Sequence, residues 1–300
     1  MKIDLTKINT EQQNENSYHI DRQSTAGILK IINNEDQIIA RQIALKIQNI
    51  ENVIDNIFPN FQKNGRLIYI GAGTSGRLGI LDASEMLPTF SVEPGKIIGL
   101  IAGGKEAIEN PIEGAEDDTE LALDDLKRIN FNKTDAIIGI SASGRTPYVI
   151  KALSYAREIG AYTAGLCMTT DSEMKTVTKD VIDIITGGEV ITGSTRMKSG
   201  TATKMVLNMI STTLMVKLGK VYNNLMIDIK ATNEKLKERC VNIVKKITKN
   251  SDTDLIRNTL IATNYNCAIS SLMILKNLDK KEAQKLLQEN HNILAKIINL

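Results

Sequence analysis

Glycine and proline are distributed unevenly along the chain, and this distribution constrains the fold more than any other feature. All five prolines lie between Pro59 and Pro147, no glycine follows Gly219, and Gly27 is the only glycine in the first 55 residues. Because glycine and proline disfavour helix interiors, both ends of the chain are predicted to be helical. The predicted parts are an N-terminal helical segment (1–55), a central domain (56–222) and a C-terminal all-helical subdomain (223–300).

The central domain alternates short apolar runs with helical patterns, which is typical of a parallel sheet covered by helices. We therefore expect an α/β fold with a doubly wound, five-stranded parallel sheet. In that architecture ligands bind beyond the carboxyl ends of the strands, where loops lead into helices. The five predicted strands are 67–70, 97–102, 136–141, 162–168 and 181–186.

Composition argues against several classes of function. A net charge of +2 from 37 basic and 35 acidic residues gives no drive toward nucleic acid. No apolar run reaches the roughly 20 residues of a membrane helix, and the N-terminus lacks the apolar core of a signal peptide. We therefore expect a cytoplasmic protein without a membrane partner. Three widely spaced cysteines suggest neither a disulfide framework nor a zinc site, and we expect buried, reduced thiols at Cys167, Cys240 and Cys267.

The stretch RLIYIGAGTSGRLG (66–79) joins the first predicted strand to a G-x-G-x-x-G turn. Dinucleotide-binding folds use this spacing, but they also need an acidic residue at the end of the second strand. Here that strand ends in IAGG, and the nearest acid, Glu93, precedes the strand. The sequence therefore disfavours a nicotinamide cofactor. No His, Cys and Asp cluster has metal-ligand spacing either, so neither a cofactor nor a metal is expected.

A second turn, SASGRT (141–146), repeats the Ser-Gly-Arg tripeptide of 75–77 after the third predicted strand. Its hydroxyl groups lie beside a predicted helix N-terminus, an arrangement that binds a phosphate monoester without a metal. Serine, threonine and glycine are also ordinary turn and cap residues, so the repetition of the pattern supports the prediction. The predicted phosphate-binding residues are Thr74, Ser75, Gly76, Ser141, Ser143, Gly144 and Thr146.

Five sequence blocks resemble a known family in their order and spacing. They are IGAGTSGRLGILDASE, IAGG, EGAED, ISASGRTPYV and GEVITGSTRMKSGTATKMVLNMIST. The SASGRT turn resembles that of sugar isomerase (SIS) domains, and the five blocks together resemble the N-acetylmuramic acid 6-phosphate etherases. The resemblance starts at TEQQNENSYHID and continues, less distinctively, into the C-terminal helices. The chain departs from the family pattern at Gly188, where proline is expected.

The resemblance implies an SIS-type fold and a phosphosugar lyase that acts in cell-wall amino sugar recycling. Such an enzyme cleaves the D-lactyl ether at C3 of N-acetylmuramic acid 6-phosphate (MurNAc 6-phosphate), giving N-acetylglucosamine 6-phosphate (GlcNAc 6-phosphate) and D-lactate. An alkyl ether has a poor leaving group, so we expect opening of the sugar ring to acidify the C2 proton. Lactate is then eliminated and water adds at C3. The resemblance also favours a homodimer with the site near the subunit contact.

Two glutamates match the catalytic pair of the family. The resemblance implies that Glu85, in LDASE, protonates the leaving lactate oxygen and that Glu116, in EGAED, is the partner acid or base. Glu85 lies nine residues past Gly76, which is about 13 Å along a continuous helix. Either the helix breaks before Pro88 or Glu85 serves a site that another protomer completes.

The segment GEVITGSTRMKSGT (188–201) supplies the remaining candidates for substrate binding: Glu189, Ser194, Thr195 and Lys198. Two rival functions stay open. An aldose–ketose isomerase of the same fold would also transfer protons between carbon atoms, but it would release no lactate. A non-catalytic phosphosugar regulator, such as the glucokinase regulatory protein, could keep the phosphate turns and lose the glutamates. Both glutamates are present here, and the chain has no second sugar domain.

Overall fold

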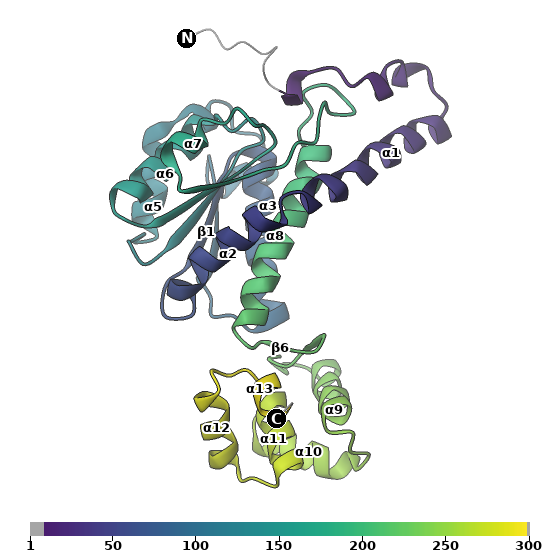
Figure 1. Cartoon of the computed structure of the whole chain (residues 1–300), viewed down its shortest axis with the longest axis vertical. Coiled ribbons are helices and arrows are strands. Elements are labelled where there is room, and N and C mark those ends of the chain that lie inside the picture. The colour runs from purple at the N-terminus through teal and green to yellow at the C-terminus, as the bar shows by residue number, and fades with distance from the viewer. Residues whose placement is uncertain (1–8, 299–300) are drawn as a thin grey trace. The chain divides into compact units, whose positions relative to one another are not determined.

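The computed structural model describes residues 9–298, which divide into two compact units (Figure 1). Unit 1 holds the described residues up to Ser84 together with Gly95–Ile210. Unit 2 holds Glu85–Pro94 together with the described residues from Ser211 onward. The three-part division of the chain into 1–55, 56–222 and 223–300 stays a prediction.

Unit 1 contains a five-stranded parallel sheet with the strand order β2-β1-β3-β4-β5. The central strands β1 and β3 are buried at every position, which explains why they read as continuous apolar runs. All five predicted strands are confirmed, although the last one ends three residues earlier than the predicted 186. The strands are β1 (Leu67–Gly71), β2 (Ile97–Ile101), β3 (Ala136–Ile140), β4 (Tyr162–Cys167) and β5 (Asp180–Asp183).

The order of the strands places a topological switch point between β1 and β3. Leu67 of β1 pairs with Ile97 of β2 on one side and with Ala136 of β3 on the other. The chain therefore leaves β1 and β3 in opposite directions across the sheet, which opens a crevice at their carboxyl ends. The two Ser-Gly-Arg turns follow these two strands, so they lie next to each other.

Helices cover both faces of the sheet, as a doubly wound fold requires (Figure 1). Ile68 and Ile70 belong to a core cluster that includes Leu153 of α6. Tyr69 points to the opposite face, where a Cβ built on Gly79 of α3 would lie 2.9 Å from the tyrosine Cβ. The main helices that begin in unit 1 are α1 (Thr25–Ala44), α2 (Ile47–Phe61), α3 (Gly73–Phe90), α5 (Thr119–Arg128), α6 (Pro147–Glu158) and α8 (Lys198–Lys217); two shorter ones are α4 (Glu106–Glu109) and α7 (Met174–Val177).

Unit 2 is helical apart from a short hairpin of β6 (Val221–Tyr222) and β7 (Leu225–Met226). Asn233, Asp252, Asn266 and Asp279 cap four helix N-termini with their side chains, which explains where each helix begins. The predicted helical tail is therefore confirmed. Its helices are α9 (Glu234–Thr248), α10 (Thr253–Ala262), α11 (Cys267–Lys276), α12 (Lys280–Glu289) and α13 (Ala295–Ile298).

The three cysteines lie in the interior, as the composition predicts. Cys167, Cys240 and Cys267 are all buried and free. Cys240 and Cys267 lie in the hydrophobic core of unit 2. Across residues 9–298, no helix combines the length and the apolar character needed to cross a membrane.

Candidate functional site

The turn after β3 gathers three hydroxyl groups. The Oγ atom of Ser141 lies 2.8 Å from Oγ1 of Thr146 and 3.3 Å from Oγ of Ser143. Ser141 is buried, whereas Ser143 and Thr146 are partly exposed. Because α6 begins directly after this cluster, at Pro147, the hydroxyls lie at a helix N-terminus, where an anion is stabilised.

Glycine at position 144 is required by the backbone of this turn. Gly144 has a φ of +68°, and a Cβ there would lie 2.3 Å from Oγ of Ser172. The Ser172 hydroxyl donates to the Gly144 carbonyl at 3.2 Å, which holds the turn in place. The neighbouring cation is already paired, because Nη2 of Arg145 donates to Oδ2 of Asp171 at 2.8 Å.

The turn after β1 also requires glycine at two positions, Gly76 because of close packing and Gly73 because of its backbone conformation. A Cβ on Gly76 would lie 2.7 Å from the carbonyl oxygen of Gly71, and Gly73 has a φ of +51°. Thr74 and Ser75 are partly exposed in the first turn of α3. The two candidate phosphate turns therefore share one edge of the sheet and one kind of geometry, a hydroxyl-bearing turn at a helix N-terminus.

The predicted candidate Glu189 caps α8. One carboxylate oxygen, Oε2, accepts from the N–H of Lys198 at 2.8 Å. The other, Oε1, accepts from the N–H and the hydroxyl of Ser199 at 2.9 and 2.6 Å. Glu189 is fully buried, so its charge is compensated by the backbone donors of the helix N-terminus.

Lys198, another predicted candidate, forms a buried ion pair with a residue that sequence reasoning missed. Its Nζ atom donates to Oε2 of Glu35 at 2.6 Å, and the side chains are 2% and 4% exposed. The side-chain amides of Asn14 and Asn16 also donate to Glu35, at 2.6 and 2.8 Å. Burial by itself raises the pKa of Glu35, but hydrogen bonds from Lys198, Asn14 and Asn16 outweigh it and lower the pKa below its ordinary value.

Gly188, where the chain departs from the family pattern, packs closely against the N-terminal segment. A Cβ at this position would lie 2.6 Å from the carbonyl oxygen of Gln12. The Gly188 carbonyl accepts from Asn14 Nδ2 at 3.0 Å and from Lys198 Nζ at 3.1 Å. The N-terminal segment and the start of α8 therefore meet at this carbonyl, and the same two side chains also donate to Glu35 of α1.

The start of α8 lies against the start of α3. A Cβ built on Gly200 would lie 3.5 Å from Cγ2 of Thr74 and 3.6 Å from the carbonyl oxygen of Thr195. Ser194 and Thr195, just before α8, are partly exposed. The structure therefore brings the 194–200 segment to the first Ser-Gly-Arg turn, beside the turn that follows β3.

Glu116 lies next to the first turn, on the wall of a pocket of about 200 Å³. It belongs to the 3₁₀ turn Ala115–Asp117 and is exposed. Gly73 and Arg77 of α3 line the same pocket. Glu116 therefore has the access to solvent and the neighbouring helix N-terminus that a proton-transfer group at this edge of the sheet would need.

Glu85 is an exposed residue of α3, in the part of this helix that belongs to unit 2. The helix runs from Gly73 to Phe90 and includes Pro88, so the alternative that it breaks before Pro88 is wrong. Proline removes one backbone donor, but later bonds continue the helix, because the N–H of Ser91 donates to the Leu87 carbonyl at 3.0 Å. Glu85 therefore lies about 13 Å along the helix axis from Gly76.

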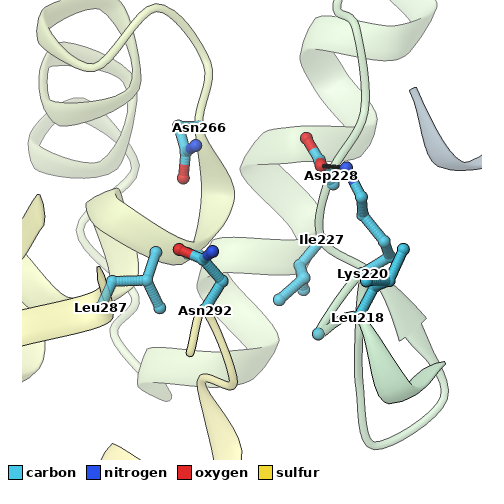
Figure 2. A pocket seen from close by; sticks show the side chains of 9 residues that line it. Leu218, Lys220, Ile227, Asp228, Asn266, Leu287 and Asn292 are labelled. Carbon is cyan, nitrogen blue, oxygen red and sulfur yellow. Dashed lines mark hydrogen bonds and ion pairs between the residues drawn. The ribbon is translucent and has the colours of Figure 1, made fainter. Parts of the chain in front are cut away.

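Unit 2 contains a separate pocket of about 270 Å³ (Figure 2). Lys220 and Asp228 form an ion pair in its wall, and the side chains of Asn266 and Asn292 lie across from them. None of the candidate residues from the sequence line this pocket. Its volume exceeds that of the pocket beside Glu116, but its described lining residues include no hydroxyl-bearing turn for a phosphate, so it is not the candidate site.

Two further observations bear on the candidate site. Within the described range 9–298, no group of three or more His, Cys, Asp or Glu side chains is placed to hold a metal ion. Both histidines of the chain, His19 and His291, are exposed. The pocket beside Glu116 is lined by two carboxylates, Glu113 and Glu116, and by no histidine among its described residues, so carboxylates are the candidates for proton transfer there.

The chain is similar to an SIS-domain family and, over nearly its full length, to several named relatives. Residues 49–157 match the family model of the glucokinase regulatory protein N-terminal SIS domain. A relative from Mycoplasma mycoides named N-acetylmuramic acid 6-phosphate etherase is 54% identical over 98% of this chain and 97% of its own length. Relatives of the same name from Caldanaerobacter subterraneus and Escherichia coli are 52% and 48% identical over 99% of this chain and cover 96% and 99% of their own lengths.

A crystal structure from Bacteroides fragilis, described as a phosphosugar isomerase involved in capsule formation, is similar in fold. Its TM-score is 0.50 at 18% sequence identity, and the match covers 66% of this chain and 94% of that chain. At such low identity the likeness concerns the fold alone. Together with the matched family model, it confirms the expected SIS-type α/β architecture.

Proposed function

This chain belongs to the N-acetylmuramic acid 6-phosphate etherase family, and on that premise we propose that it converts MurNAc 6-phosphate into GlcNAc 6-phosphate and D-lactate. The reaction makes it a carbon–oxygen lyase of amino sugar catabolism. The observation that supports the proposal most strongly is the cluster of Ser141, Ser143 and Thr146 hydroxyls at the N-terminus of α6. It lies at the switch point of the sheet, where phosphorylated ligands of such folds bind.

We assign the sugar phosphate group to this hydroxyl cluster. A phosphate monoester carries up to two negative charges, and the hydroxyls and the helix N-terminus can donate hydrogen bonds to its oxygens. Thr74, Ser75 and Gly76 of the neighbouring turn, together with Ser194 and Thr195, complete the surroundings of the sugar. Lys198 and Glu189 are buried, so they contribute by holding the segment before α8 in place.

The two glutamates carry the proton transfers of the proposed reaction. With the sugar ring open, the C2 proton is acidic because it lies next to the aldehyde, and Glu116 accepts it. The C3–O bond then breaks with its electron pair going to the lactate oxygen, which Glu85 protonates. An unsaturated aldehyde remains; water adds to its C3 and a proton returns to C2. No electrons are gained or lost overall, so the reaction needs no redox cofactor.

We further propose that the enzyme is a cytoplasmic homodimer in which a second copy of the chain completes the site. The unbroken α3 helix separates Glu85 from Gly76 by about 13 Å along its axis, which is long for a single sugar phosphate. If Glu85 of a second copy serves the site instead, this separation along one helix no longer limits the reaction. A charged sugar phosphate does not cross a lipid bilayer unaided, so we assign the enzyme to the compartment in which its substrate is phosphorylated.

The proposed reaction is tested by the products formed from MurNAc 6-phosphate in isotopic water. We expect D-lactate and GlcNAc 6-phosphate, with solvent deuterium at C2 and solvent oxygen at C3, because both the proton and the hydroxyl are replaced. A ketose formed without lactate would identify an isomerase instead. Binding of the phosphosugar without turnover would identify a non-catalytic regulator. If C2 of the product carries no deuterium, the reaction is a direct displacement at C3 and not an elimination.

Changing Ser143 to alanine should weaken the binding of GlcNAc 6-phosphate by about 1–3 kcal/mol, the range for hydrogen bonds to a charged group. Calorimetric titration measures this loss. The matched control is Ser154→Ala in α6, the helix that follows the turn, because it removes a hydroxyl that donates to Glu158 at 3.4 Å instead. If phosphorylated and unphosphorylated sugars bind the wild-type chain equally well, the phosphate assignment fails.

A further inference from the structure

The pocket beside Glu116 contains one cation, Arg77, among its described lining residues. Its Nε atom donates to the carbonyl of Ile108 at 2.8 Å. Neither Nη1 nor Nη2 of Arg77 forms a hydrogen bond or ion pair with any residue in the described part of the chain. Arg145, at the same place in the other Ser-Gly-Arg turn, is instead paired with Asp171. Of the two equivalent arginines, Arg77 has the terminal nitrogens free for a ligand.

By number, most of the other residues in the wall of this pocket are small or apolar. Ala102, Ala107 and Ile112 contribute apolar surface, and Glu113 and Glu116 contribute carboxylates. A volume of about 200 Å³ is well above the roughly 10–15 Å³ that a single water needs on the same measure, so the pocket has room for a group of several non-hydrogen atoms. The two carboxylates disfavour a doubly charged phosphate here. A small ligand group with one negative charge and a methyl group fits this chemistry.

We propose that this pocket binds the D-lactyl substituent of MurNAc 6-phosphate, with its carboxylate paired to Arg77 and its methyl group against Ala102 and Ala107. This inference rests on the proposed function. The substrate carries two separate anions, and the hydroxyl cluster after β3 accounts only for the phosphate. A guanidinium can bind a carboxylate through two parallel hydrogen bonds, which fixes its orientation as well as its charge.

The placement gives Arg77 a role in specificity as well as in binding. GlcNAc 6-phosphate has a hydroxyl where MurNAc 6-phosphate has the lactyl ether, so only the substrate can use Arg77. The ether oxygen of a lactyl group held in this way lies in the same pocket as Glu116. Arg77 therefore discriminates substrate from product and orients the leaving group, while the phosphate turns bind both molecules.

Changing Arg77 to alanine should lower kcat/KM for MurNAc 6-phosphate by about 10- to 100-fold, the effect of losing a hydrogen-bonded charge pair. Binding of GlcNAc 6-phosphate should not change. Exchange of solvent oxygen into C3 of GlcNAc 6-phosphate should also persist, because this reaction involves no lactyl group. Arg157→Ala is the control: it removes a guanidinium that donates to the Thr176 carbonyl at 2.7 Å, and it should leave kcat/KM unchanged.

A neutral analogue separates the lactyl contact from an effect on folding. MurNAc 6-phosphate with its lactyl carboxylate converted to an amide should bind a Glu85→Gln enzyme more weakly than the acid does, whereas Arg77→Ala in the same background should bind the two equally. The Glu85→Gln background slows turnover during the titration. An Arg77→Ala enzyme that still prefers the acid, or that loses product binding and oxygen exchange as well, overturns the inference. Absence of lactate release by the wild-type chain overturns the proposed function instead, and the acid-versus-amide titration still tests the pocket.

Discussion

Changing Glu85 to glutamine should lower the rate of D-lactate release from MurNAc 6-phosphate by about 10²- to 10⁴-fold, the range expected for a lost general acid. The fold should be unaffected, because Glu85 is an exposed side chain of α3. Exchange of the C2 proton with solvent should continue in this variant, since that step precedes protonation of the leaving oxygen. Proton exchange and lactate release are therefore measured side by side.

The Glu116→Gln variant should fail at an earlier step. If Glu116 is the base, C2 exchange itself is lost, and lactate release falls with it. Glu120→Gln is the matched control, because Glu120 is also exposed but lies in the first turn of α5, outside the pocket. Wild-type rates of both reactions in the Glu85→Gln enzyme would remove Glu85 from the mechanism.

Changing Lys198 to methionine should lower the free energy of unfolding by about 3–5 kcal/mol, the cost of leaving a buried charge without its partner. Glu35 would keep its hydrogen bonds from Asn14 and Asn16 but lose the ammonium group 2.6 Å away. Denaturant unfolding followed by circular dichroism measures the loss, since the chain has no tryptophan to report on it.

The Lys198→Met/Glu35→Gln double variant identifies the cause of that loss. Removing both charges should recover most of the stability, because no unpaired charge then remains in the interior. Lys127→Met is the surface control: Lys127 pairs with Asp124 at 3.4 Å, and the side chains are 62% and 73% exposed, so the free energy of unfolding should change little. A double variant that is less stable than Lys198→Met would show that packing, and not the unpaired charge, causes the loss.

Local pattern was sufficient to predict the five strands and the helical ends of the chain. A strand buried on both faces needs an apolar residue at every position, so β1 and β3 are visible as short continuous runs. Likewise, α9 presents an apolar face at helical spacing and begins at the side-chain cap of Asn233. Signals of this kind depend only on neighbours along the chain.

Position within the sequence is a poor guide to the environment of a residue whose partners are distant along the chain. Glu35 lies in an amphipathic helix, where a glutamate normally faces water. It is buried instead, in an ion pair with Lys198, which is 163 positions away along the chain. The break considered before Pro88 does not occur, because one lost backbone donor does not outweigh the bonds that continue α3. The TEQQNENSYHID block contains Asn14 and Asn16, so it is the part of the sequence that could have indicated their contacts with Glu35.

The sequence by itself determined the fold class, the family and the two hydroxyl-bearing turns, because strand patterns and motif spacings are properties of short segments. Only the tertiary structure decided which side chains of these motifs are already paired with other residues of the chain. Ser-Gly-Arg occurs twice with the same letters, yet Arg145 is paired with Asp171 and Arg77 keeps its terminal nitrogens free among the described residues. Glu189, similarly, is a carboxylate whose oxygens are both used to cap α8. Hydrogen bonds and ion pairs depend on distance in space, and folding brings together charges that the sequence keeps far apart.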